Sequence, residues 1–197
     1  TNDYLRITVY VAPFISLMPP NDSYNVCSIN VPADDNNTWF YFVAWGDENC
    51  IDTDSWRAFN HAVVGKDLNA DYSTKRTLDN DFMQDRDAMA AGNFTGVPGI
   101  PNQDIMMWVS MGAWPERHRD HLGASDLAVV EFRKLMLEAV KAFDAGSAPA
   151  IGTTQSNIPH REIQSWQGIV TKDSDWTQYG VGEIEAEALG HAKTKAS

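Results

Sequence analysis

Apolar and polar residues alternate near the start of the chain and predict a β-strand over residues 5–14. One face of this strand carries Ile7, Val9 and Val11, and the other carries Arg6, Thr8 and Tyr10. Residues 24–31 and 38–45 predict two further strands, because turn-forming Pro, Asn and Asp residues bound them. Three strands joined by short turns indicate an antiparallel sheet. A strand this close to the first residue, with no earlier element to pair with, indicates that an N-terminal part is missing.

The third predicted strand, T-W-F-Y-F-V-A-W at residues 38–45, is apolar on both faces. Such a strand is covered on both sides, or is covered on one side and lines a pocket on the other. The two alternatives for an aromatic pocket wall are Trp39, Tyr41 and Val43, or Phe40, Phe42 and Ala44. The pattern favours neither face.

Helical spacing of apolar residues predicts two short helices, one over residues 54–64 that ends at Gly65 and one over residues 82–91 that ends at Gly92. Their apolar positions are Trp56, Phe59 and Val63 in the first helix, and Phe82, Met83 and Met89 in the second. The polar residues 66–78 between them predict a surface loop.

The clearest helical pattern runs from a capping Ser125 to about Ala145, where Gly146 and Pro149 end it. Its predicted buried stripe consists of Ala128, Phe132, Leu135, Met136, Ala139, Val140 and Phe143. This pattern indicates packing and no chemistry. Beyond residue 150 the chain is predicted to be irregular, and residues 183–197 are expected to fray or to dock on a neighbour.

A loop over residues 92–101 holds three Gly and two Pro, so special backbone angles are expected to fix its path. Asn102 is predicted to cap the helix that follows, and Asp104 then falls in the first turn. The helix dipole favours an acid at such a position without any further role. Apolar surface on this helix comes from Ile105, Met107, Trp108 and Met111.

Composition indicates a globular protein, since 43% of the 197 residues are hydrophobic and seven are Trp. This length suffices for one sizeable core or for part of a larger domain. A net charge of −12 argues against binding to nucleic acid or to an anionic membrane, both of which need clusters of Lys and Arg. Neither a membrane-spanning apolar run nor a signal peptide is found, so a cytoplasmic protein is expected.

The sequence contains only two cysteines, Cys27 and Cys50, and neither lies in a C-x2-C or C-x-H pattern. No zinc or iron–sulfur site can therefore be built from them locally. Two buried thiols in a reducing compartment are the expected state, with a disulfide as the alternative.

Several ordered motifs lie between residues 80 and 126: N-D-F-M-Q-D-R, T-G-V-P-G-I, Q-D, S-M-G and H-L-G-A-S-D. This order resembles the C-terminal catalytic region of Rieske non-haem iron oxygenases, within the group of phthalate dioxygenases and dehydrodivanillate O-demethylases. The resemblance implies an α+β fold with an antiparallel sheet flanked by helices, of the helix-grip type. Residues 1–197 would be the C-terminal portion of the catalytic domain, with no Rieske domain in this chain.

The same resemblance implies that Asp104 is the carboxylate ligand of a mononuclear non-haem Fe(II). The two His ligands of that family come from an upstream D-x2-H-x4-H motif, which this sequence lacks. The C-x-H and C-x2-H motifs of a Rieske [2Fe–2S] cluster are also absent. This cluster is therefore expected in the full-length protein and not on this chain, which would be inactive alone.

In function, the resemblance implies that electrons pass from a reductase or ferredoxin through the Rieske cluster and across a subunit boundary to the mononuclear iron. Dioxygen is activated there to hydroxylate or O-demethylate an aromatic substrate, with an aromatic acid favoured. The family also implies a homotrimer. The alternative is a non-catalytic helix–sheet domain that binds a small aromatic ligand.

Arg6 is a candidate to bind a substrate carboxylate, because a guanidinium pairs with it through two hydrogen bonds. An edge arginine in solvent or in a salt bridge is the favoured alternative. His118 and His121 form an H-x2-H pair, but the neighbouring Arg117 and Arg119 would repel a metal cation. His121 belongs to the H-L-G block and is given a structural or interfacial role.

The remaining polar residues indicate no chemistry. His61 is interpreted as a surface or core histidine, and Ser110 lacks the Asp and His partners of a serine hydrolase. The acids Asp81, Asp85, Asp87, Glu183 and Glu185 are interpreted as solvated charges. Nothing singles out a glycosidase pair among them.

Overall fold

The computed structural model describes residues 2–20, 24–46, 48, 50–153, 160 and 163–179. The chain divides into two compact units. The sheet unit comprises Thr1–Val31, Trp39–Val43 and His118–Ser197, and the helical unit comprises Pro32–Thr38 and Ala44–Arg117. No helix within the described ranges is long and apolar enough to cross a membrane.

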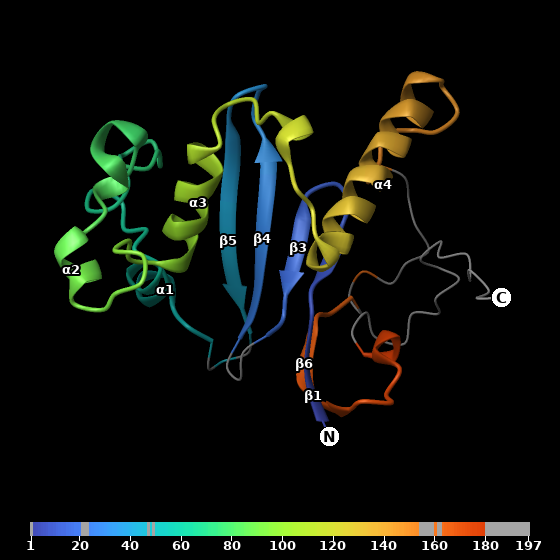
Figure 1. The fold of residues 1–197 in the computed structure, drawn as a ribbon, viewed down its shortest axis with the longest axis horizontal. Helices are drawn as coiled ribbons and strands as arrows, with labels where there is room; N and C mark the ends of the chain where they lie inside the picture. Colours follow the sequence, from blue (N-terminus) through green and yellow to red (C-terminus); the bar gives the residue numbers. More distant parts are fainter. Residues whose placement is uncertain are drawn as a thin grey trace. The chain divides into compact units, whose positions relative to one another are not determined.

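The sheet unit is built on a four-stranded sheet in the order β2-β3-β4-β5. Its strands are β2 (Val9–Val11), β3 (Ile15–Met18), β4 (Asn25–Pro32) and β5 (Thr38–Trp45). The pairs β2/β3 and β3/β4 are antiparallel, and the arrows of β4 and β5 also run in opposite directions (Figure 1). The expected antiparallel sheet and α+β class are therefore confirmed.

A second, two-stranded sheet joins β1 (Asn2–Ile7) to β6 (Trp166–Thr171) in antiparallel register. The single strand expected over residues 5–14 is therefore wrong, because Ile7 ends β1 and the chain turns at 12–14 after β2. The irregular structure expected beyond residue 150 is also wrong at β6. That strand is stabilised by a partner more than a hundred residues away in sequence, which no local pattern reveals.

Strand β5 begins and ends where predicted, but one of its two faces is not covered by other parts of this chain. It lies at an edge of the sheet, and Trp39, Tyr41, Val43 and Trp45 are between 39% and 50% exposed. Phe40 and Phe42 on the other face are half-buried, and their rings stack with centroids 6.1 Å apart. One aromatic face of β5 is thus open to solvent in this chain.

Helix α4 (Leu127–Asp144) contacts β2 through the side chain of Tyr10. The Tyr10 ring meets Phe132 edge-on at a centroid distance of 5.1 Å, and its hydroxyl is 3.7 Å from Met136 Sδ. The predicted cap Ser125 is wrong, because a 3-10 turn, η3 (Ala124–Asp126), makes Asp126 the residue before the helix. The helix ends as predicted, with Gly146 in the left-handed region.

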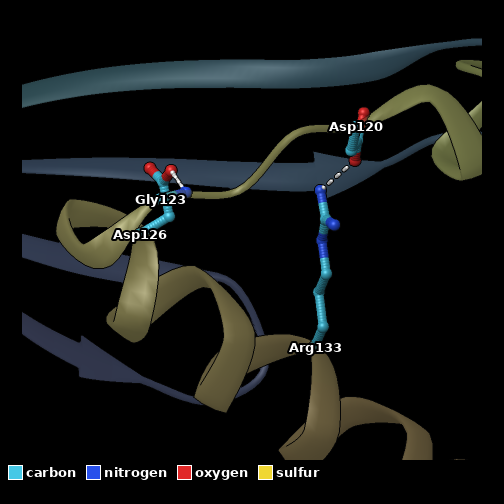
Figure 2. Close-up of polar contacts among 4 residues, drawn as sticks. All are labelled: Asp120, Gly123, Asp126 and Arg133. Atoms are coloured by element: carbon cyan, nitrogen blue, oxygen red, sulfur yellow. Dashed lines mark hydrogen bonds and ion pairs between the residues drawn. The ribbon is translucent and has the colours of Figure 1, made fainter.

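The predicted buried stripe of α4 is only partly correct. Met136 and Ala139 are half-buried, but Phe132, Leu135, Val140 and Phe143 are between 42% and 55% exposed. Two polar contacts lie at the start of this helix, one within the H-L-G-A-S-D segment and one between Arg133 of the helix and Asp120 just before that segment (Figure 2). The Asp126 carboxylate accepts a hydrogen bond from the Gly123 amide at 2.8 Å, and Arg133 pairs with Asp120 at 2.8 Å (Figure 2).

In the helical unit, α1 (Thr53–Phe59) is shorter than predicted. Asp52 caps it by accepting hydrogen bonds from the amides of Asp54 and Ser55. The helix stops before Gly65 because the Asn60 side chain donates to the Trp56 carbonyl and His61 adopts a φ of 51°. A mostly exposed loop over residues 66–77 follows, as expected.

The continuous helix predicted over residues 82–91 is wrong. The structure instead has a 3-10 helix, η1 (Leu78–Met83), and a short α2 (Arg86–Ala90) capped by the Asp85 carboxylate. Phe82 and Met83 have φ values of 55° and 52°, which breaks any right-handed helix and buries the Phe82 ring.

Candidate metal centre

The loop over residues 92–99 delivers the chain to α3 (Ile100–Ser110), as the Gly and Pro pattern predicts. Gly96 and Gly99 adopt φ values of 65° and 82°. A Cβ atom on Gly99 would lie 2.4 Å from the Asn60 carbonyl oxygen, so only glycine fits where the two backbones cross. The start of α3 is therefore held against the end of α1.

Helix α3 starts earlier than predicted, and this changes the interpretation of Asp104. Gly99 is the capping residue, so Asn102 lies inside the helix and is not its cap. Asp104 is then the fifth helical residue, and the first turn contains no acid. The helix dipole falls off beyond the first turn, so it does not account for an acid at this position.

Two amide side chains anchor the beginning of α3. Asn102, 7% exposed, donates from Nδ2 toward the carbonyl oxygens of Pro98 at 3.0 Å, His61 at 3.1 Å and Asn60 at 3.4 Å. Gln103 donates from Nε2 to the Val97 carbonyl at 2.9 Å. Sequence reasoning missed both roles, since a buried amide is recognised only once its carbonyl partners are placed.

The carboxylate of Asp104 has no hydrogen-bond or ion-pair partner in the part of the chain that the structure describes. The residue is exposed overall, yet nearby protein atoms remove part of its hydration and raise the pKa of its carboxyl group. An acid without an internal partner on a well-anchored helix is suited to bind a cation from outside these residues.

Asp104 fits one position of a two-His, one-carboxylate iron site, because it offers free oxygen donors of the required kind. The described residues contain no group of three or more His, Cys, Asp or Glu that could hold a metal. His118 and His121 are exposed and belong to no such group. Among the described residues, Asp104 is therefore a candidate for one ligand position only.

The other candidates have plain structural settings. Arg6 is exposed on β1, opposite Gln167 of β6. Ser110 donates its hydroxyl to the Met107 carbonyl, and the half-buried His61 offers its own carbonyl to Asn102. Cys27 and Cys50 are free thiols, but only Cys27 is buried as expected, and Cys50 is half-buried. Glu183, Glu185 and the segment 183–197 lie outside the described residues.

Comparison with known proteins places the chain in a family. All residues from 1 to 197 match the model of the family described as LigXa C-terminal domain like. The chain belongs to this family. The resemblance to the catalytic region of Rieske oxygenases, recognised from the motifs over residues 80–126, is thereby confirmed.

Two relatives of this chain are both named as oxygenase subunits of dioxygenases. The phthalate 4,5-dioxygenase oxygenase subunit of Pseudomonas putida is 55% identical over 180 residues, which cover 91% of this chain and 40% of that protein. The 3-chlorobenzoate-3,4-dioxygenase oxygenase subunit of Comamonas testosteroni is 27% identical over 188 residues, covering 88% and 43%. The chain thus spans about two fifths of the length of these curated relatives.

Proposed function

We propose that this chain is the C-terminal portion of the catalytic domain of an oxygenase component that oxidises an aromatic substrate. Both relatives are named as oxygenase subunits of dioxygenases with aromatic acids as substrates, which supports an aromatic acid here. Their names favour dioxygenation over O-demethylation. They also favour an oxygenase over a non-catalytic domain that binds an aromatic ligand.

The observation that carries this proposal is the setting of Asp104. Its carboxylate has no partner within the described residues, lies beyond the first turn of α3 and has a raised pKa through lost hydration. Asp104 would be the anionic ligand of a mononuclear non-haem Fe(II), and two His residues from elsewhere in the full polypeptide would complete the set. When bound, ferrous iron in such a site offers open positions to dioxygen and substrate.

The residues of this chain then have defined tasks. Asp104 supplies a negative oxygen donor, and the anchored first turns of α3 hold that donor in place. Arg6 is proposed to pair with the carboxylate of the substrate, since its guanidinium is exposed on β1.

The full protein needs further parts. A Rieske [2Fe–2S] cluster would be held outside this chain, because Cys27 and Cys50 lack the family motif. A reductase or ferredoxin is the proposed electron donor, a homotrimer the proposed assembly and the cytoplasm the proposed location. The chain by itself is expected to be inactive.

Turnover by the full polypeptide tests the proposal. Purified protein, supplied with a compatible reductase and NADH, is offered phthalate, 3-chlorobenzoate and an aryl methyl ether, and products are identified by mass spectrometry. We expect a dihydrodiol from an aromatic acid and none from Asp104→Ala. Full turnover by Asp104→Ala would refute the role of this carboxylate, and formaldehyde from the ether would favour O-demethylation.

A further inference from the structure

We propose that Asn102 is a positioning residue for Asp104, and that its buried amide sets where the Asp104 carboxylate lies. This inference rests on the proposed function of Asp104 as a metal ligand. Asn102 would not touch the metal. It would act through the backbone of α3.

The contacts of Asn102 join two segments to one helix. Its Nδ2 group faces the carbonyls of Asn60 and His61, which follow α1, and the carbonyl of Pro98 in the loop before α3. A side-chain amide has two N–H donors, so these carbonyls share both of them. The contact with Asn60 is buried and the other two are partly buried, so these carbonyls need such partners, and the amide is the common link between the two segments and α3.

Asn102 and Asp104 lie two residues apart within one helix, where each residue adds a rise of about 1.5 Å. Because the backbone of α3 is hydrogen-bonded, a shift or tilt of the helix at Asn102 moves Asp104 by nearly the same amount. Metal ligands must keep their distances within about 0.2 Å, so a small displacement of the helix start is enough to weaken metal binding.

A merely structural role of Asn102 would lower stability without any special effect on metal affinity. Gln84 provides the matched control, because its amide also donates to a carbonyl of the same loop, that of Thr95, at 2.6 Å. Gln84 lies before α2, outside α3. Loss of its amide disturbs the loop but leaves the link between α3 and the end of α1.

The test uses the full polypeptide, freed of mononuclear iron under anaerobic conditions, and measures the affinity for Fe(II) by competition with a ferrous chelator. The variants are Asn102→Ala, Asn102→Ser, Gln84→Ala and Asp104→Ala, and the unfolding midpoint of each is recorded. Outer-shell residues of metal sites change affinity by about 10- to 100-fold, and Asn102→Ala is expected to weaken Fe(II) binding by that factor. Asn102→Ser keeps one donor and should lie between Asn102→Ala and the native protein.

Gln84→Ala should bind Fe(II) as the native protein does, even where it lowers the unfolding midpoint as much as Asn102→Ser. Native affinity in Asn102→Ala, or in Asn102→Ser should the alanine variant not fold, would overturn the positioning role. Equal weakening by Gln84→Ala and Asn102→Ser at equal loss of stability would overturn it too. Native affinity in Asp104→Ala would instead overturn the proposed function itself.

Discussion

Gly99 is the residue whose replacement should reveal most clearly how α3 is held. In Gly99→Ala, the new Cβ would lie 2.4 Å from the Asn60 carbonyl oxygen and 3.0 Å from Asn102 Nδ2. An ordinary contact between carbon and oxygen needs about 1 Å more, so the backbone of Asn60 or of α3 must move. Alanine at a φ of 82° and a ψ of 123° also costs about 1–3 kcal/mol.

Gly112, just beyond α3, offers a control with nearly the same backbone φ. Its φ is 84°, and a Cβ atom added there would have no neighbour within 4 Å. Gly112→Ala therefore carries only the conformational cost, about 1–2 kcal/mol. In Gly99→Ala the loss of the buried contact between Asn102 and Asn60, worth about 1–3 kcal/mol, adds to the backbone cost, for a total of about 2–6 kcal/mol.

Hydrogen exchange of peptides covering residues 97–110 in the full polypeptide measures this difference locally. We expect exchange in Gly99→Ala to be faster than in native protein by about one and a half to four orders of magnitude, because each loss of about 1.4 kcal/mol in the free energy of opening speeds exchange about tenfold. Gly112→Ala should change it by about tenfold. Equal exchange in the two variants would refute the close packing of Gly99 against Asn60.

Three further outcomes are expected. Cys27 is buried, and burial raises the pKa of its thiol and keeps it protonated. Iodoacetamide should therefore label Cys27 at least about ten times more slowly than the half-buried Cys50. Equal labelling rates of the two thiols, measured by mass spectrometry, would contradict this. Burial raises the pKa of the Tyr10 hydroxyl. The protonated hydroxyl therefore contributes its full share of the free energy of unfolding below the unfolded pKa of about 10, and this share is lost as pH rises through the folded pKa. The difference in free energy of unfolding between the native protein and Tyr10→Phe, measured with urea, should become smaller above about pH 10. The partly exposed Asp120–Arg133 pair should contribute at most about 1 kcal/mol in a double-mutant cycle, and a coupling of several kcal/mol would contradict its exposure.

Local sequence patterns predicted the helices and strands whose limits are set by residues close in sequence. Strand β5 was placed with its limits because seven apolar or aromatic residues follow Thr38 and lie between turn-forming segments. The end of α4 was placed by Gly146, whose left-handed φ is a local property. Strand β6 was missed because its stability depends on pairing with β1.

The candidate site was predicted in part. Resemblance to a family pointed to Asp104, but the sequence pattern placed the helix cap three residues too late, at Asn102 instead of Gly99. The structure assigns the cap to Gly99 and gives Asn102 a tertiary role with the carbonyls beyond α1. No local rule reports such contacts, because they join residues about forty positions apart in the chain.

The iron content of the Asp104→Ala full polypeptide tests the central claim most directly. Mononuclear iron is counted separately from the iron of the proposed Rieske cluster, whose visible absorption is recorded in the same sample. Asp87→Ala is the control, since Asp87 is an exposed acid on α2 in the same unit. We expect Asp104→Ala to lose about one iron per chain and to keep the cluster spectrum, while Asp87→Ala keeps both. Retention of the mononuclear iron in Asp104→Ala would contradict the assignment of this carboxylate as a ligand.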